Sequence, residues 1–306
     1  MAEKNTKNKR VLLIILVLLI ISIIALSTQF GTNGRIKSSG QTRKFLVYIP
    51  DSYDPEQPTP LVISIHGFVQ WPAHQQSMTG WNKLADENGF IVVYPKGTGF
   101  PLRWNTRPSE EDPGAIEEEL RFFADLIDHL GSTYNIDPSR VYVNGMSNGG
   151  GMSDILACEF SDRIAAIGGV AGAYIYPRGD CHPARPMPVI AFHGGDDRVV
   201  PYQGGASSRD ENFVFPSVED WAAGWVEINS CGTLPEISVI TNEITRTYFT
   251  GCKSNAEVIL YSVAGAGHTW PGGEKLPVWI AGYTNQDINA SALMWEFFRG
   301  YSLKGE

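Results

Sequence analysis

Residues 137–150 read DPSRVYVNGMSNGG, and this stretch decides the fold. The β-rich run VYVN at 141–144 leads into GMSNG at 145–149, and the chain from 148 to 159 has helical character. A G-x-S-x-G motif between a strand and a helix is typical of a nucleophile elbow, in which a tight turn lifts the serine above a sheet. We therefore predict that Ser147 is a nucleophile. The alternative is a Gly-rich turn whose serine only caps the helix.

Strands and helices alternate on both sides of this motif. We expect strands at 44–49, 61–66, 90–94, 141–144, 165–170, 188–192 and 257–263, and helices at 81–88, 116–130, 148–159, 218–229 and 288–299. Continuous apolar strands that alternate with amphipathic helices predict a mostly parallel sheet covered on both faces. The chain shows no internal repeat. We expect one α/β domain over residues 42–303.

Composition excludes several classes of protein. The 306 residues are 43% hydrophobic and only 19% charged, which excludes a disordered chain, a coiled coil and a collagen-like fibre. The net charge is −9 and no basic run follows the first ten residues, so we expect no nucleic-acid partner. The four Cys form no C-x-x-C pair, which argues against a zinc ribbon or a thioredoxin-type site. We expect neither a metal nor an organic cofactor.

The N-terminus resembles an export signal. Four basic residues precede an apolar run over 11–26 that only Ser22 interrupts: Lys4, Lys7, Lys9 and Arg10. A basic segment followed by such a run directs export, so we expect the remainder of the chain outside the cytoplasm. Residues 1–27 are then a cleaved signal peptide or a retained membrane anchor, and the protein contacts a membrane only there. A buried core helix is the alternative. The polar residues 28–41 are expected to form a linker.

Export bears on whether the cysteines form disulfides. All four follow the signal: Cys158, Cys181, Cys231 and Cys252. An even number of Cys in an oxidising compartment predicts two disulfides, for which four Cys allow three pairings. Buried free thiols are the alternative.

A serine nucleophile needs a general base, and in α/β-hydrolases the chain order is Ser, acid, His. Three histidines follow Ser147. His182 lies in a loop before a strand, and His193 ends a strand and would lie deep. His268 lies in a Gly-rich loop after the strand expected at 257–263, which is where the base of such a site belongs. We predict that His268 is the base.

The acid should follow the preceding strand, where Asp196 and Asp197 are adjacent. We favour Asp197, because the three residues Val199, Val200 and Pro201 remain after it to close the loop. Asp196 is the alternative, and the Asp that is not used would be a turn residue that bonds to its own backbone.

An oxyanion hole needs two N–H donors. One should be the backbone N–H of Asn148, directly after the nucleophile, and the other that of Phe68, in the loop after an early strand. We interpret His66 as a structural residue of that loop. Trp104 and Trp270 lie in loops near the predicted site and are candidates to line the substrate cleft.

Taken together, these motifs resemble the polyhydroxybutyrate-depolymerase-like esterases, a family akin to feruloyl and acetyl-xylan esterases. The resemblance runs through residues 42–300 and rests on HG at 66–67 with Gln70, VVYPKGTG at 92–99, Trp104-Asn105, DPSRVYVNGMSNGG at 137–150, FHGGDDRVVPYQGG at 192–205 and GAGHTWPGG at 265–273. It implies an α/β-hydrolase fold with Ser147, Asp197 and His268 as the triad. It also implies two local disulfides, Cys158–Cys181 and Cys231–Cys252.

The resemblance implies an exported serine esterase. Its substrates would be short-chain hydroxyalkanoate esters, such as polyhydroxybutyrate-type oligomers, or feruloyl and acetyl esters of polysaccharides. Polymer-degrading relatives usually carry a separate polymer-binding domain that this sequence lacks, so we expect soluble esters or oligomers. An acyltransferase or a peptidase would use the same triad. A non-catalytic envelope-binding protein on the same scaffold is the alternative from another class.

Overall fold

The computed structural model describes residues 31–303 except 108–109, 176–177 and 233. The predicted signal or anchor at 1–27 and the first residues of the expected linker lie outside this range. Of the helices in the described part of the chain, none combines the length and apolar character needed to cross a bilayer.

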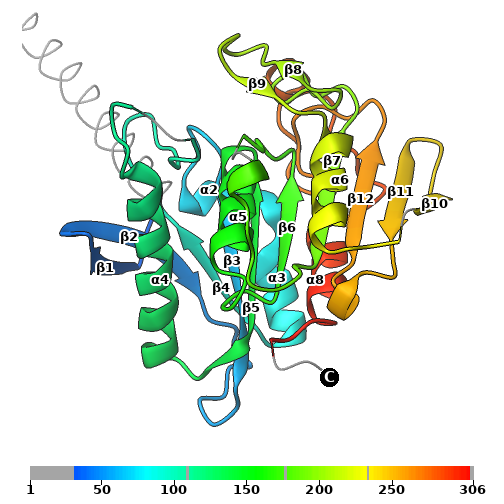
Figure 1. Ribbon diagram of the computed structural model, residues 1–306. Helices are drawn as coiled ribbons and strands as arrows, with labels where there is room; N and C mark the ends of the chain where they lie inside the picture. The colour runs from blue at the N-terminus through cyan, green and yellow to red at the C-terminus, as the bar shows by residue number, and fades with distance from the viewer. Residues whose placement is uncertain (1–30, 108–109, 176–177, 233, 304–306) are drawn as a thin grey trace, which may run out of the picture.

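A ten-stranded sheet forms the centre of the molecule, in the order β1-β2-β4-β3-β5-β6-β7-β12-β11-β10 (Figure 1). Its strands are β1 Gly34–Ser38, β2 Gln41–Tyr48, β3 Thr59–Ile65, β4 Ile91–Pro95, β5 Ile136–Met146, β6 Ala166–Val170, β7 Val189–Gly194, β10 Glu236–Val239, β11 Ile244–Phe249 and β12 Val258–Val263. The six strands from β4 to β12 are parallel, and antiparallel strands flank them at both edges. The prediction of a mostly parallel sheet is confirmed.

Helices cover both faces of the sheet. They are α2 Pro72–Thr79, α3 Trp81–Asn88, α4 Ala115–Thr133, α5 Asn148–Glu159, α6 Val218–Ile228, α7 Val278–Ala281 and α8 Ala290–Phe298, with 3-10 turns at Arg178–Asp180 and Lys253–Asn255. Figure 1 shows α4, α5 and α6 in front of the sheet and α3 and α8 behind it. Each face has its own apolar core, and β3 is buried along its whole length between them. This two-sided burial is why the parallel strands read as continuous apolar runs.

One expectation about the organisation is wrong in part. Residues 34–38, inside the expected linker, form the edge strand β1, which pairs antiparallel with β2. The register places Gly34 opposite Phe45. A Cβ at position 34 would lie 2.1 Å from the Phe45 ring, so this glycine lets an aromatic side chain pack against the strand. The glycine at position 34 therefore has a packing reason.

Two disulfides lie on the α6 side of the sheet. Cys158 bonds to Cys181, and Cys231 bonds to Cys252, which leaves no free cysteine in the chain. The local pairing implied by the family resemblance is confirmed. Cys158 lies in the last turn of α5, and Cys231 follows the end of α6 by three residues, so each bridge joins the end of a helical segment to another loop.

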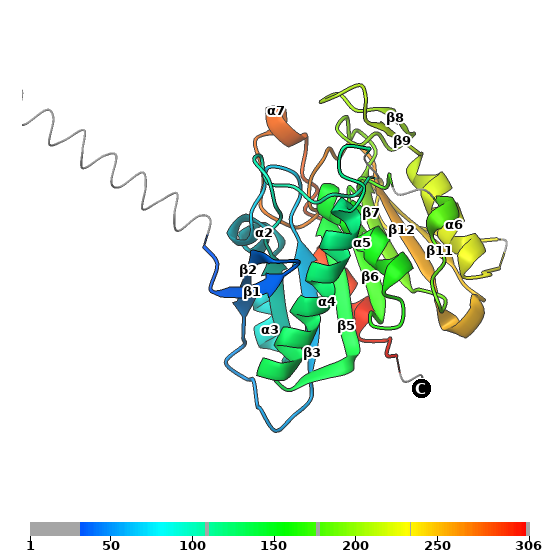
Figure 2. The same ribbon diagram turned by 60° about the vertical axis from the view of Figure 1, so that its left-hand side comes forward.

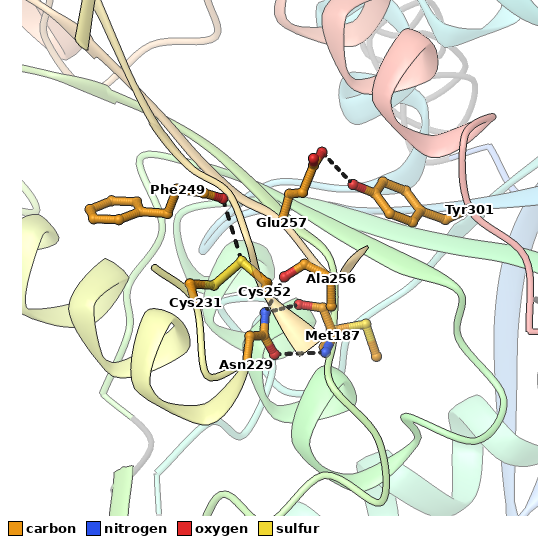
Figure 3. The surroundings of a disulfide bond; sticks show 8 residues. All are labelled: Met187, Asn229, Cys231, Phe249, Cys252, Ala256, Glu257 and Tyr301. Carbon is orange, nitrogen blue, oxygen red and sulfur yellow. Dashed lines mark hydrogen bonds between the residues drawn. A yellow bond between two sulfur atoms is a disulfide. The ribbon is translucent and has the colours of Figure 1, made fainter. Parts of the chain in front are cut away.

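The second bridge lies beside a buried amide that joins three segments (Figure 3). The Asn229 side chain, at the end of α6, accepts from Met187 N at 2.9 Å and donates to Met187 O at 2.7 Å and to Ala256 O at 2.8 Å. Met187 precedes β7 and Ala256 precedes β12, so one side chain fixes the starts of both strands. Those two strands carry the loops of the candidate site at their other ends.

Candidate active site

Ser147 lies in a sharp turn between β5 and α5. Its backbone has φ 56° and ψ −120°, a conformation that is costly for a residue with a side chain. The two glycines of the motif allow it. A Cβ on Gly145 would lie 2.2 Å from Gly149 O, and a Cβ on Gly149 would lie 2.2 Å from Ile65 O. Positions 145 and 149 are therefore glycines, because neighbouring backbone atoms approach them too closely for a residue with a Cβ.

Backbone hydrogen bonds join the loops that follow the parallel strands. Ser147 N donates to Val170 O at 2.9 Å, at the end of β6. Asp196 N, after β7, donates to Ala266 O at 2.9 Å, in the loop after β12. The carboxyl ends of neighbouring parallel strands meet at one edge of a sheet, and ligand sites of open α/β sheets lie there. The three predicted catalytic side chains therefore belong to one edge.

Asp197 and His268 are in direct contact. His268 Nδ1 lies 2.7 Å from Asp197 Oδ2. The other carboxylate oxygen, Oδ1, accepts from Val199 N at 2.8 Å and from Val200 N at 2.9 Å. The Asp197 side chain is fully buried, and that of His268 is 13% exposed. The carboxylate is thus held by its own loop while the imidazole still reaches the surface.

The structure distinguishes Asp196 from Asp197 as the partner of His268. Asp196 is exposed, and it is Asp197 that contacts His268. Burial opposes ionisation of Asp197, but attraction to His268 and hydrogen bonds from His193 and His268 hold its pKa well below the usual range. His193 is buried, with its Nε2 2.9 Å from Val200 O and 3.4 Å from Asp197 Oδ2. It therefore packs against the carboxylate and helps to hold it in place. His182 is exposed.

The Ser147 hydroxyl makes no hydrogen bond to His268 within the described residues. The Asp–His half of the arrangement is formed, and the Ser–His half is open. Catalytic hydrogen bonds are often long in a site without substrate and shorten when the substrate binds. The roles of Ser147 as nucleophile and His268 as base therefore stay predictions.

Asn148 and the loop before Phe68 adjoin the serine. Asn148 is the first residue of α5, so its N–H is one of the donors that a helix leaves without an intrahelical acceptor. Phe68 follows Gly67 in the loop after β3, and the position of a Cβ on Gly67 lies 3.3 Å from Ser147 Cβ. Gly67 N donates to Gln70 Oε1 at 2.7 Å, which closes this loop into a tight turn. The loop that carries Phe68 thus approaches the serine, and the assignment of the two N–H groups as oxyanion donors stays a prediction.

The prediction that Trp104 and Trp270 line the substrate cleft is wrong. Their side chains are 2% and 1% exposed. Trp104 Nε1 donates to His66 O at 2.9 Å, and Trp270 Nε1 donates to Ser291 Oγ at 3.1 Å. Both indoles are buried and hydrogen-bonded inside the protein, because segments distant in the sequence cover the loops that carry them.

Other aromatic side chains are exposed at this edge; from the sequence we named Phe68 only for its backbone N–H and did not name the other two. Phe100 is 98% exposed, Trp279 on α7 is 87% exposed and Phe68 is 52% exposed. The helix α7 and the short hairpin of β8 Gly205–Ala206 and β9 Val214–Phe215 stand above the strand ends (Figure 2). The signal that could have found Phe100 is its place in the run GTGFPL, where two glycines and a proline exclude a buried strand.

Among the residues that the structure describes, no group of three or more His, Cys, Asp or Glu could hold a metal ion.

Comparison with known proteins identifies the relatives of this chain. The family model described as esterase PHB depolymerase matches residues 44–202, more than half of the sequence. Feruloyl esterase B of Piromyces equi is 30% identical over 233 residues, which are 74% of this chain and 42% of the relative. A bifunctional acetylxylan esterase/xylanase of Neocallimastix patriciarum is 33% identical over 187 residues, 60% of this chain and 26% of the relative. The chain thus spans less than half the length of either relative.

Solved structures share the fold. The acetyl xylan esterase from Aspergillus awamori superimposes with a TM-score of 0.56 and 17% sequence identity, over 78% of this chain and 94% of that one. The architecture is that of an α/β-hydrolase, as the sequence predicted.

Proposed function

The chain belongs to the esterase PHB depolymerase family, and on that premise we propose that it hydrolyses carboxylic esters through Ser147, His268 and Asp197. One observation carries the proposal. A serine held at φ 56° between strand and helix shares a sheet edge with a histidine whose Nδ1 contacts a buried carboxylate at 2.7 Å. A nucleophile, a base and a group that orients the base are the parts that acyl transfer needs.

Acylation begins with the His268 tautomer. The Asp197 carboxylate accepts from Nδ1–H, so Nε2 carries the free lone pair and can take the proton of the Ser147 hydroxyl. The serine oxygen then bonds to the ester carbonyl carbon, and its proton moves to Nε2. Asp197 stays ionised throughout, because its surroundings hold its pKa low, and it stabilises the imidazolium that forms.

The tetrahedral intermediate places its negative charge on the former carbonyl oxygen. The N–H groups of Asn148 and Phe68 would donate to this oxygen, each stabilising the transition state by about 3 kcal/mol. His268 then gives its proton to the leaving alcohol as the carbon–oxygen bond breaks. Water attacks the acyl-enzyme by the same steps, and the products are a carboxylic acid and an alcohol.

The substrate class that we propose is short-chain hydroxyalkanoate esters or feruloyl and acetyl esters of polysaccharides. The activities of the relatives named above support this class. The exposed rings of Phe68 and Phe100 support an acyl group with apolar character. The two disulfides support an oxidising compartment, and with it the proposal that residues 1–27 direct export.

Hydrolysis of an ester panel tests the proposal. The panel holds p-nitrophenyl butyrate, methyl ferulate, acetylated xylan and 3-hydroxybutyrate oligomers. Ser147→Ala should lose hydrolysis of every ester that the parent cleaves, at unchanged melting temperature. Ser132→Ala is the matched control, because Ser132 is exposed near the C-terminal end of α4 and its hydroxyl donates to His129 O. Equal activity of the parent and Ser147→Ala would refute the proposal.

A further inference from the structure

The buried Trp104 contacts both halves of the oxyanion site. Its indole Nε1 donates to His66 O at 2.9 Å, two residues before Phe68. Its backbone N donates to Asn148 Oδ1 at 2.7 Å, and its backbone O accepts from Asn148 Nδ2 at 3.0 Å. Resting on the function proposed above, we propose that Trp104 and His66 are positioning residues that fix both oxyanion donors, the N–H of Phe68 and the N–H of Asn148, in one rigid frame.

The His66 ring fixes the loop on the Phe68 side. The ring is fully buried, its Nδ1 lies 2.8 Å from Gly67 O and its Nε2 accepts from Gly97 N at 3.0 Å. Since Nε2 is an acceptor, the single proton of the neutral ring is on Nδ1 and donates to Gly67 O. Burial lowers the pKa of His66 to about 4, so this tautomer is maintained at neutral pH.

The geometry of the peptide bond transmits this contact to Phe68. Gly67 C=O and Phe68 N–H belong to the same planar trans peptide, so they point in opposite directions. A hydrogen bond that holds the Gly67 carbonyl toward the His66 ring therefore directs the Phe68 N–H away from the ring. Gln70 N donates to the same carbonyl at 3.2 Å, which fixes the peptide a second time.

On the other side, the side-chain amide of Asn148 makes two hydrogen bonds to the backbone of Trp104, as a neighbouring strand would. Its amide accepts from the backbone N of Trp104 and donates to the backbone O, and it also donates to Thr106 Oγ1 at 3.2 Å. With its side chain held at two atoms, Asn148 cannot rotate its backbone freely. The first N–H of α5 is thereby oriented at the serine turn.

The Trp104 segment is itself anchored. The indole lies 5.2 Å from the His66 ring and stacks on Phe122 of α4 with ring centroids 6.3 Å apart. Beneath it a buried ion pair joins Arg43 Nη2 to Glu119 Oε2 at 2.7 Å, and Glu119 Oε1 accepts from the Asn105 side chain at 3.3 Å. The frame that holds the two donors is thus continuous with α4 and β2.

Trp104→Phe removes the indole N–H and keeps an aromatic ring. The readouts are kcat and KM for p-nitrophenyl butyrate and Ki for an alkyl trifluoromethyl ketone, whose serine adduct carries the oxyanion. We expect kcat to fall and Ki to rise together by about ten-fold or more, with KM nearly unchanged, because only the transition state uses the oxyanion donors. Trp225→Phe is the matched control. It also loses a buried indole donor, at 2.9 Å from Asp154, and should leave kcat and Ki unchanged.

A second pair of variants tests His66, and this test holds whether or not the Trp104→Phe variant folds. The Asn side-chain N–H can replace the Nδ1–H that bonds to Gly67 O, whereas Gln places its amide near the Nε2 position. We expect His66→Asn to keep a higher kcat and a lower Ki than His66→Gln. Equal Ki values for the two variants, or an unchanged Ki in Trp104→Phe, would overturn the inference while Ser147-dependent hydrolysis stands. A parent without Ser147-dependent hydrolysis would instead overturn the proposed function, and this inference with it.

Discussion

Acid should destabilise this protein through His66. The buried ring has its pKa lowered from 6.5 to about 4, mainly by burial, and the charges of His74 and Lys96 lower it further. Between these values the unfolded chain binds a proton that the folded chain does not, so stability falls as pH falls. The contribution is complete above about pH 7 and is lost progressively from about 6.5 toward 4.

The magnitude follows from the two pKa values. Linkage gives a loss of about 2 kcal/mol at about pH 5 and about 3 kcal/mol at about pH 4, relative to neutral pH. That is a large share of the net stability of a typical domain, which is about 5–15 kcal/mol. His74 also has a lowered pKa, so the effect of His66 has to be measured as a difference between proteins.

The assay is urea unfolding of the parent and of His66→Asn, followed by tryptophan fluorescence at several pH values. The parent should be the more stable protein at neutral pH, and this advantage should shrink by about 3 kcal/mol as the pH approaches about 4. All other titrating groups are common to both proteins and cancel in the difference. A difference that stays constant over this range would refute the reasoning, because His66 would then titrate alike in the folded and unfolded chains.

Three further changes have separate readouts. Asp197→Asn leaves His268 in the wrong tautomer, so kcat should fall by about 10³–10⁴ while the circular dichroism spectrum stays unchanged. A fall of less than ten-fold would show that the carboxylate does not orient the base. Ser217→Ala removes the oxygen that caps α6 and should lower the free energy of unfolding by about 1 kcal/mol in urea. An unaltered midpoint would show that the cap contributes nothing. Replacing Cys158 and Cys181 by Ala should cost about 3 kcal/mol, since the bridge closes a loop with a sequence separation of 23. Equal stability of the double variant would contradict the loop-entropy account.

The sequence predicted the central elements because their pattern is dictated by burial on two faces. Helix α3 and helix α5 begin and end where we expected them, and the parallel strands agree within a few residues. The strands β10 and β11 were missed for a physical reason. They form an exposed antiparallel edge, so polar and apolar residues occur on them without a continuous buried run.

The candidate site was predictable where local sequence determines it. The strained turn at Ser147 requires its glycines, and the loop after β7 holds Asp197 by its own N–H groups. Trp104 was not predictable in this way. Its burial depends on Arg43 and on α4, which are distant in the chain, and no local pattern shows that an aromatic loop residue is covered. The same long-range contacts turn a supposed substrate contact into a structural one.

Mass spectrometry of the protein treated with a fluorophosphonate, before and after proteolytic digestion, tests the central claim most directly. The account predicts a single adduct, on the peptide that contains Ser147, with loss of ester hydrolysis in proportion to labelling. Asp197→Asn should label far more slowly, because His268 then lacks its orienting partner. Hydrolysis that persists after complete labelling of Ser147, or an adduct on another serine that abolishes hydrolysis, would contradict the account.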